Sequence, residues 1–192
     1  VDEIAPTYLV VARLFLASIL LGPIFIRKKD LILMSKEIPS ILILGIINAA
    51  LPFFLFAYAA QDLSAGMLSI LNGTSPLFAL IIAITWFRQN TTLMQILGLG
   101  LGFLGLMVFI GTDQISFIFY PVLLCLIGAF CYAYSNNILF RLNHIKSAAL
   151  ASVTMISGFF FSLPLIFLEP TDFSTDLSLK IIFAIFFLGL VS

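Results

Sequence analysis

The sequence predicts an all-α, polytopic membrane helix bundle, and three observations support this fold class. Hydrophobic residues make up 62% of the chain, charged residues only 9%, and the mean hydropathy is +1.21. A soluble domain carries about a quarter charged residues and could not bury so much apolar surface. Apolar runs of about 20 residues, the length of a membrane-spanning helix, recur along the whole chain. Membrane barrel strands are excluded because they are shorter and alternate polar with apolar residues.

The apolar runs define about seven spans. The first, 4–26, is interrupted only by Arg13. The next five are uncharged and cover residues 38–61, 63–87, 93–112, 114–140 and 147–168. The seventh begins after Lys180 and is still apolar at Ser192, where the sequence stops. Because the twelve residues 181–192 cannot cross a bilayer and the sequence begins at Val1, we expect an internal piece of a longer membrane protein.

The basic residues alternate between successive connections. Seven of the nine lie in the connections 27–37, 88–92 and 141–146. The other three connections, near 61–62, 113 and 169–180, hold only Lys180. The positive-inside rule therefore predicts that these three connections are cytoplasmic and that residue 1 lies on the outer side of the membrane.

No pattern typical of an enzyme, a metal site or a nucleic-acid surface is present in the sequence. Cys125 and Cys131 are six residues apart and fall on different faces of a helix, and His144 has no acid or cysteine near it. No nucleophile elbow or P-loop occurs, and the basic residues are few and scattered. We therefore expect a protein without catalysis, cofactor, metal or nucleic acid, whose partners are the lipid bilayer and a small molecule.

Arg13 is the charged residue of the first span. It lies about 10 Å deep, at 1.5 Å per residue, where a guanidinium is costly. It either snorkels to the surface, or faces inward, where it holds an anionic group or pairs with Glu3 or Asp62.

Polar and helix-bending residues interrupt the second and third spans. Pro52 lacks the N–H that would bond to the carbonyl of Asn48, and Pro76 stands in the same relation to Asn72. The third-span break, which also holds Gly73, Thr74 and Ser75, lies about 14–20 Å below the surface. Because only residues 61–62 separate the two spans, we expect them to be antiparallel neighbours whose breaks meet near the midplane.

These breaks have two interpretations. Irregular backbone at this depth is tolerated only where it is buried in protein or lines a water-filled cavity. Either Thr74 and Ser75 satisfy the freed groups of an ordinary proline kink, or the breaks offer carbonyls and hydroxyls to a substrate. For two neighbouring helices we favour the substrate site.

The fourth and fifth spans add two features. Gly98, Gly102 and Gly105 share one helix face, which predicts close packing inside the bundle or a homodimer interface, with packing favoured. The fifth span ends near the cytoplasm in a polar segment that includes Tyr134, either an interfacial anchor or part of an inner vestibule. The predicted substrate pathway comprises Arg13, Asn48, Pro52, Asn72, Thr74, Ser75, Pro76 and Tyr134.

Residues 48–111 resemble the first half of an EamA-family transporter of the drug/metabolite transporter superfamily. The segments that carry the resemblance are "LSAG" (63–66), "LNGTSPLF" (71–78) and "QILGLGLGFLGLMVFIG" (95–111). "ARLFLASILL" (12–21) is similar to the second helix of that family, and "AFCYAYSNNILFRL" (129–142) to the helix that opens its second repeat. One departure is Arg88-Gln89-Asn90, where the family commonly has Gly-Glu-Arg or Gly-Glu-Lys.

The resemblance implies ten helices in two inverted five-helix repeats. Residues 1–112 would then hold helices two to five of the first repeat, and 113–192 the truncated start of the second. It also implies a secondary transporter of a bacterial inner membrane that exports a metabolite, amino acid or drug-like compound by alternating access. The alternatives from other classes are a seven-helix receptor or sensor, and a membrane scaffold that uses the glycine face.

Overall fold

The computed structural model describes residues 6–25, 28–86, 88, 90, 92–110 and 115–168, and these residues form helices joined by short turns. The α-helices are α1 (Pro6–Phe25), α2 (Lys28–Met34), α3 (Ile38–Leu44), α4 (Leu51–Ala59), α5 (Ala65–Asn72), α6 (Ser75–Thr85), α7 (Leu93–Ile110), α8 (Ile115–Arg141) and α9 (Ser147–Ser162). A π-helical turn, η1 (Gly45–Ala50), joins α3 to α4, and a 3-10 turn, η2 (Leu163–Leu168), follows α9. The described residues contain no strand, and the predicted all-α class is confirmed.

Within the part of the chain that the structure describes, four helical stretches are long and apolar enough to cross a membrane: Ile38–Ala59, Ala65–Thr85, Phe119–Arg141 and Ser147–Phe167. Two shorter apolar helices, Pro6–Gly22 and Leu93–Gly105, fall in the first and fourth predicted spans. The polytopic membrane bundle is therefore confirmed. The seventh predicted span and the boundary proposed between residues 112 and 113 lie outside the described residues.

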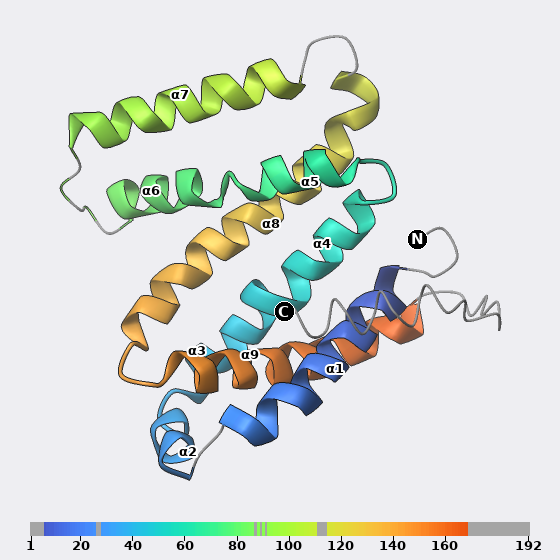
Figure 1. Ribbon diagram of the computed structural model, residues 1–192, viewed down its shortest axis with the longest axis vertical. Coiled ribbons are helices and arrows are strands. Elements are labelled where there is room, and N and C mark those ends of the chain that lie inside the picture. Colours follow the sequence, from blue (N-terminus) through green and yellow to red (C-terminus); the bar gives the residue numbers. More distant parts are fainter. Residues whose placement is uncertain are drawn as a thin grey trace.

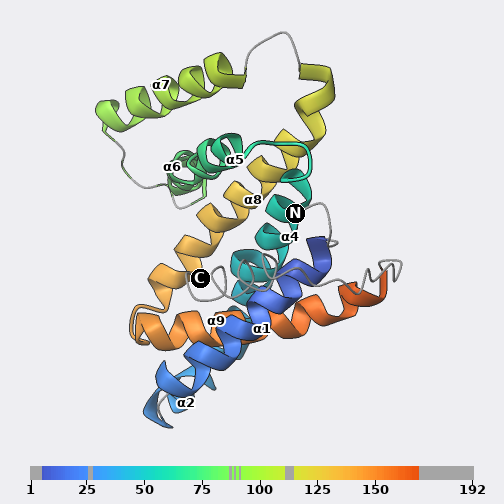
Figure 2. The ribbon, with the colours of Figure 1, turned by 45° about the vertical axis from the view of Figure 1, so that its right-hand side comes forward.

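Helix α8 is the central element of the bundle (Figure 1). It packs against η1 and α4 on one side and against α5 and α6 on the other. Helices α1 and α9 lie side by side and pack against η1 and α4, whereas α7 lies outermost, against α6 (Figure 2). The core between α1, α4 and α9 includes Val10, Leu14, Ala49, Phe54 and Met155.

The expectation that the second and third spans lie side by side is wrong. Their connection is tight, and the Ser64 hydroxyl caps α5 by accepting a hydrogen bond from the Met67 amide at 3.3 Å. Beyond this turn, however, α8 lies between α4 and α5–α6. A short turn fixes only the adjoining helix ends, so a third helix can pack between the two helices it joins.

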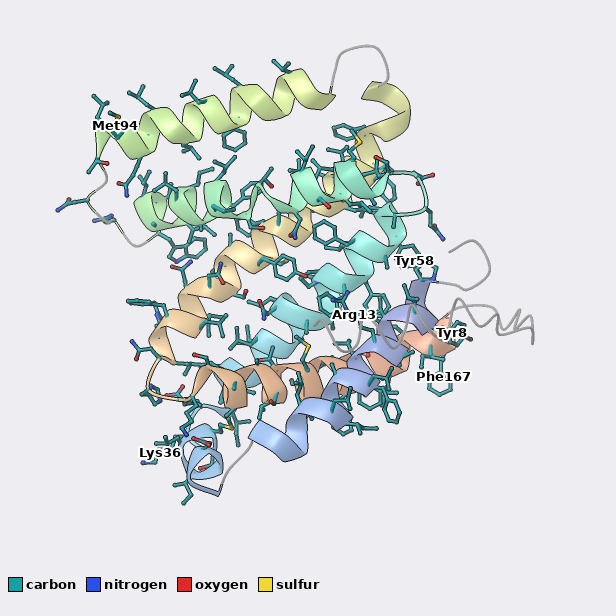
Figure 3. The ribbon with its side chains drawn as sticks, viewed as in Figure 1. Tyr8, Arg13, Lys36, Tyr58, Met94 and Phe167 are labelled. Atoms are coloured by element: carbon teal, nitrogen blue, oxygen red, sulfur yellow. The ribbon has the colours of Figure 1, made fainter. Side chains whose placement is uncertain are left out.

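Helix ends are sorted between two sides of the molecule (Figure 1). The end of α1, all of α2, the end of α6 and the α8–α9 turn lie on the left, while the start of α1 and the α4–α5 turn lie on the right. Figure 3 accordingly places Lys36 and Met94 on the left and Tyr8, Tyr58 and Phe167 on the right. The helix ends that flank the three basic connections thus share one side.

The second span contains the π-turn η1 just before Pro52. The Leu51 amide donates to the carbonyl of Ile46, five residues back instead of four. Because Pro52 has no N–H, one carbonyl near it loses its donor in either register: Asn48 in an α-helix, or Ile47 in a π-helix. The predicted irregularity is therefore present in this span as a π-turn that contains Asn48.

Candidate functional site

The break in the third span is satisfied by its own hydroxyl groups. Ser75 Oγ donates to the carbonyl of Asn72 at 2.7 Å, which replaces the N–H that Pro76 lacks. Thr74 Oγ1 donates to the carbonyl of Leu71 at 2.6 Å. The bonding between α5 and α6 is therefore that of a proline kink with locally satisfied carbonyls.

The same break nevertheless presents a polar face. Ser69, Asn72, Gly73 and Pro76 follow the spacing i, i+3, i+4, i+7 and are all exposed among the described residues, while Thr74 is buried. An asparagine in mid-span is rarely turned towards lipid, because its amide would find no partner there. This face of α5–α6 is consequently suited to contact with further protein or with water.

Asn48 makes a hydrogen bond to another helix. The hydroxyl of Ser135, on α8, donates to Asn48 Oδ1 at 2.7 Å, and it also lies 2.8 Å from the carbonyl of Tyr132. Ser135 is fully buried and Asn48 is half-buried. The contact joins the π-turn to the C-terminal third of α8.

Arg13 reaches into the bundle rather than along its surface. Its guanidinium carbon lies 4.2 Å from the centre of the Phe53 ring on α4. It also interacts electrostatically with Tyr132 on α8, whose ring stacks on Phe56 with centroids 6.2 Å apart. Figure 3 shows Arg13 on the side of α1 that faces the interior. Of the alternatives for this residue, the inward-facing one fits the described contacts.

Polar groups from three helical elements come together here. The charge of Arg13 on α1 acts on Tyr132 of α8. Tyr132 and Ser135 lie one turn apart on α8, and the Ser135 hydroxyl donates to Asn48 on η1. We call these four residues the interior polar cluster. Two aromatic rings of α4 contact this cluster: Phe53 lies under Arg13, and Phe56 stacks with Tyr132.

Glycines bring the backbones close around this cluster. A methyl group at Gly158 of α9 would lie 2.8 Å from the Cβ of Ala49 and 3.0 Å from the carbonyl oxygen of Gly45. A methyl group at Gly128 of α8 would lie 2.8 Å from the ring of Phe56. These crossings hold η1 and α4 against α9 and α8, and so fix where Asn48 and Phe56 point.

The structure separates the predicted pathway residues into groups. Arg13 and Asn48 belong to the interior polar cluster, with Pro52 buried next to η1. Residues 72–76 lie on α5–α6, beyond α8. Tyr134 is on a different face of α8 from Tyr132, and its ring meets that of Trp86 at 6.0 Å.

The glycine face of α7 is used at one position. A methyl group at Gly102 would lie 2.8 Å from Leu77 of α6, whereas one at Gly98 or Gly105 would meet nothing within 4 Å. Packing inside the bundle thus involves Gly102 among the described residues. A homodimer interface stays a prediction.

The pathway predicted from the sequence omits Tyr132, Ser135 and Phe53, which lie in or against the interior polar cluster. The signal for the first two is their i, i+3 spacing, which puts them on one face of α8, away from Tyr134. Nothing in the sequence indicates that this face meets Asn48. The described residues include no group of three His, Cys, Asp or Glu side chains that could hold a metal ion.

Comparison with known proteins finds similarity to membrane transporters. The profile of the EamA-like transporter family matches residues 1–111. An uncharacterized transporter of Archaeoglobus fulgidus is 25% identical over 194 residues, covering 98% of this chain and 67% of its own length. The uncharacterized transporter YdfC of Bacillus subtilis is 25% identical over 142 residues, covering 73% of this chain and 46% of its own. No solved structure matches the chain.

Proposed function

Because the chain belongs to the EamA-like transporter family, we propose that its interior polar cluster lines the substrate pathway of a secondary transporter. The membership rests on a match to more than half of the chain, and the relatives described above are named transporters. It makes the chain an integral membrane protein and favours transport over a receptor, a scaffold or an enzyme.

The observation that carries the proposal is the hydrogen bond between Ser135 and Asn48, inside a bundle that also holds the guanidinium of Arg13. A buried polar group in a membrane protein needs a partner, and such groups usually mark substrate or ion pathways. Transporters place these groups where a helix is irregular, so that carbonyls lacking helical donors can face the substrate. The π-turn that contains Asn48 has this character.

The polar face of α5–α6, which lies beyond α8 from the interior polar cluster, is a second surface that we propose to contact substrate or water, and we call it the second wall. Asn72 and Pro76 are exposed there, and the carbonyls of the break already have donors. These residues would therefore contact substrate or water through the Asn72 amide rather than through backbone carbonyls. Tyr134 and Trp86 would form the edge of this wall near the basic connections.

The substrate, direction and orientation belong to the same proposal. We take the compound to be a small metabolite, amino acid or drug-like molecule, moved outward by alternating access across a bacterial inner membrane. The basic connections would be cytoplasmic, and the side shared by their flanking helix ends supports this orientation. The chain spans about two thirds of one relative and under half of the other, so the activity described is that of a longer protein.

The test measures flux in proteoliposomes of the full-length protein, with labelled amino acids and an amphiphilic cation as candidate substrates. Asn48→Leu replaces the amide by an apolar group of similar size, and we expect it to lower flux about tenfold or more, the usual cost of lost polar contacts.

The matched control is Ile46→Leu, because Ile46 belongs to the same π-turn and is exposed on the outside. It should retain wild-type flux. Asn72→Leu and Thr74→Val test the second wall in the same assay. Wild-type flux that survives in Asn48→Leu at equal protein level removes the interior polar cluster from the pathway.

A further inference from the structure

We propose that the interior polar cluster recognises a carboxylate on the substrate, an inference that rests on the proposed transport function. The cluster combines three kinds of hydrogen-bond donor with one positive charge. The donors are the guanidinium of Arg13, the hydroxyl of Tyr132 and the amide nitrogen of Asn48. An oxyanion is the group that such a set binds best.

The orientation of Arg13 favours this ligand. Its guanidinium carbon stands over the Phe53 ring, so the aromatic contact occupies the flat face of the group. Hydrogen bonds of a guanidinium leave along its edge, in the plane, where a carboxylate can accept two of them in parallel. The cation–π contact and a bidentate carboxylate are therefore compatible.

Ser135 determines which end of the Asn48 side-chain amide faces α8. Its hydroxyl donates to Asn48 Oδ1, which directs the acceptor end of the amide towards α8. The Nδ2 end makes no hydrogen bond within the described part of the chain, and it carries two donors. Asn48 thus presents donors rather than its acceptor, which suits an anion and not an ammonium group.

The remaining wall is apolar. Phe53 and Phe56 contribute rings from α4, and the ring of Tyr132 stacks on Phe56. Every Asp and Glu of the sequence lies outside the seven predicted spans, so a cationic substrate would meet a positive charge at this depth and no acidic residue. The chemistry fits a carboxylate joined to an apolar body.

A lipid headgroup is the other source of an oxyanion. Arg13 lies about 10 Å into its span, within reach of a phosphate at the surface if the side chain extends outward. The position of the Arg13 guanidinium over the Phe53 ring of α4, inside the bundle, favours the interior ligand. The experiment separates the two sources.

The experiment measures binding to the purified full-length protein by its thermal unfolding midpoint. Three probes share one apolar body and differ in the end group: hexanoate, hexanamide and hexylammonium. We expect hexanoate to bind at least tenfold more tightly than hexanamide, and hexylammonium to give no shift. Phosphatidylglycerol is added in a separate series.

The variants are Arg13→Gln, Arg13→Lys and Lys36→Gln. Arg13→Gln should weaken hexanoate binding at least tenfold and remove the preference over hexanamide, while Arg13→Lys, which keeps the charge, should lose less. Lys36 is an exposed basic residue far from the cluster, and Lys36→Gln should bind hexanoate like the wild type (Figure 3).

Equal or tighter binding of hexanamide or hexylammonium by the wild-type protein overturns the proposal even if Arg13→Gln fails to fold. An Arg13-dependent shift with phosphatidylglycerol, without one for hexanoate, assigns the residue to lipid and also overturns it. Failure of transport itself is distinguishable, because then no compound would move in the flux assay described above.

Discussion

The two Asn–Pro pairs of this chain use neighbouring hydroxyls in opposite ways. At the third-span break, Ser75 and Thr74 donate to carbonyls of their own segment, at 2.7 and 2.6 Å. At the second-span break, the hydroxyl comes from α8, where Ser135 bonds the side chain of Asn48. The hydroxyls of the third-span break therefore bond within their own segment, whereas Asn48 of the second-span break is hydrogen-bonded to another helix, α8.

Ser135→Ala should test this tie. Removing the hydroxyl leaves Asn48 Oδ1 without its donor, and a neutral hydrogen bond contributes about 0.5–1.5 kcal/mol net. We expect the half-saturation constant for flux to rise about three- to tenfold. The effects of Ser135→Ala and Asn48→Ala should not add, because both remove the same bond.

The control for these two variants is Ser18→Ala. The Ser18 hydroxyl donates within its own helix, to the carbonyl of Leu14 at 2.7 Å. It should leave the half-saturation constant unchanged. Strictly additive effects of Ser135→Ala and Asn48→Ala would contradict a positioning role for Ser135.

At the scale of elements, the π-turn depends on a backbone crossing. Gly45 and Gly158 let η1 and α9 approach closely, and a methyl group at Gly45 would overlap the side chain of Ser157. The turn that contains Asn48 therefore packs against α9, and its Asn48 side chain accepts a hydrogen bond from Ser135 of α8.

Gly158→Ala should lower the stability of the protein. The added methyl group would meet Ala49 and the Gly45 carbonyl, and overpacking of this kind costs about 1–3 kcal/mol. The matched control is Gly98→Ala, where a methyl group meets nothing within 4 Å. It should be neutral or stabilising by up to about 1 kcal/mol, because alanine favours a helix over glycine.

Thermal unfolding of the full-length protein in detergent checks both variants. A lower midpoint for Gly158→Ala together with an unchanged or higher one for Gly98→Ala is expected. Equal midpoints would show that the crossing between η1 and α9 tolerates a side chain and does not fix the turn.

The sequence could predict what depends on local composition. The spans follow from long apolar runs, and the irregularities at Asn48–Pro52 and 72–76 follow from proline and its missing N–H. The hydroxyl-satisfied kink at 72–76 is one of the two interpretations open from the sequence, because Thr74 and Ser75 stand in the break. The π-turn and the partner of Asn48 could not be predicted, because they involve contacts with α8 and α9, which are distant in sequence.

At the scale of the whole molecule, α8 divides the predicted pathway. One of its faces carries Tyr132 and Ser135 towards α4 and η1, and another carries Tyr134 towards Trp86 of α6. The sequence predicted α4 and α5 as neighbours because their turn is short, yet helix partners are chosen by packing along whole faces. The interior polar cluster and the polar face of α5–α6 therefore stand on opposite sides of one helix.

The central claim is that Asn48 lines a pathway open to water, and cysteine accessibility tests it without knowledge of the substrate. In full-length protein lacking native cysteines, Asn48→Cys, Ile46→Cys and Lys36→Cys are exposed to a membrane-impermeant maleimide in vesicles of either orientation. Lys36→Cys marks the cytoplasmic face.

The account predicts that Asn48→Cys reacts from at least one side, while Ile46→Cys, exposed on the outer surface of the same turn and so facing lipid, does not react from either. If Asn48→Cys stays as unreactive as Ile46→Cys from both sides, Asn48 is buried in packing and the interior polar cluster is no pathway.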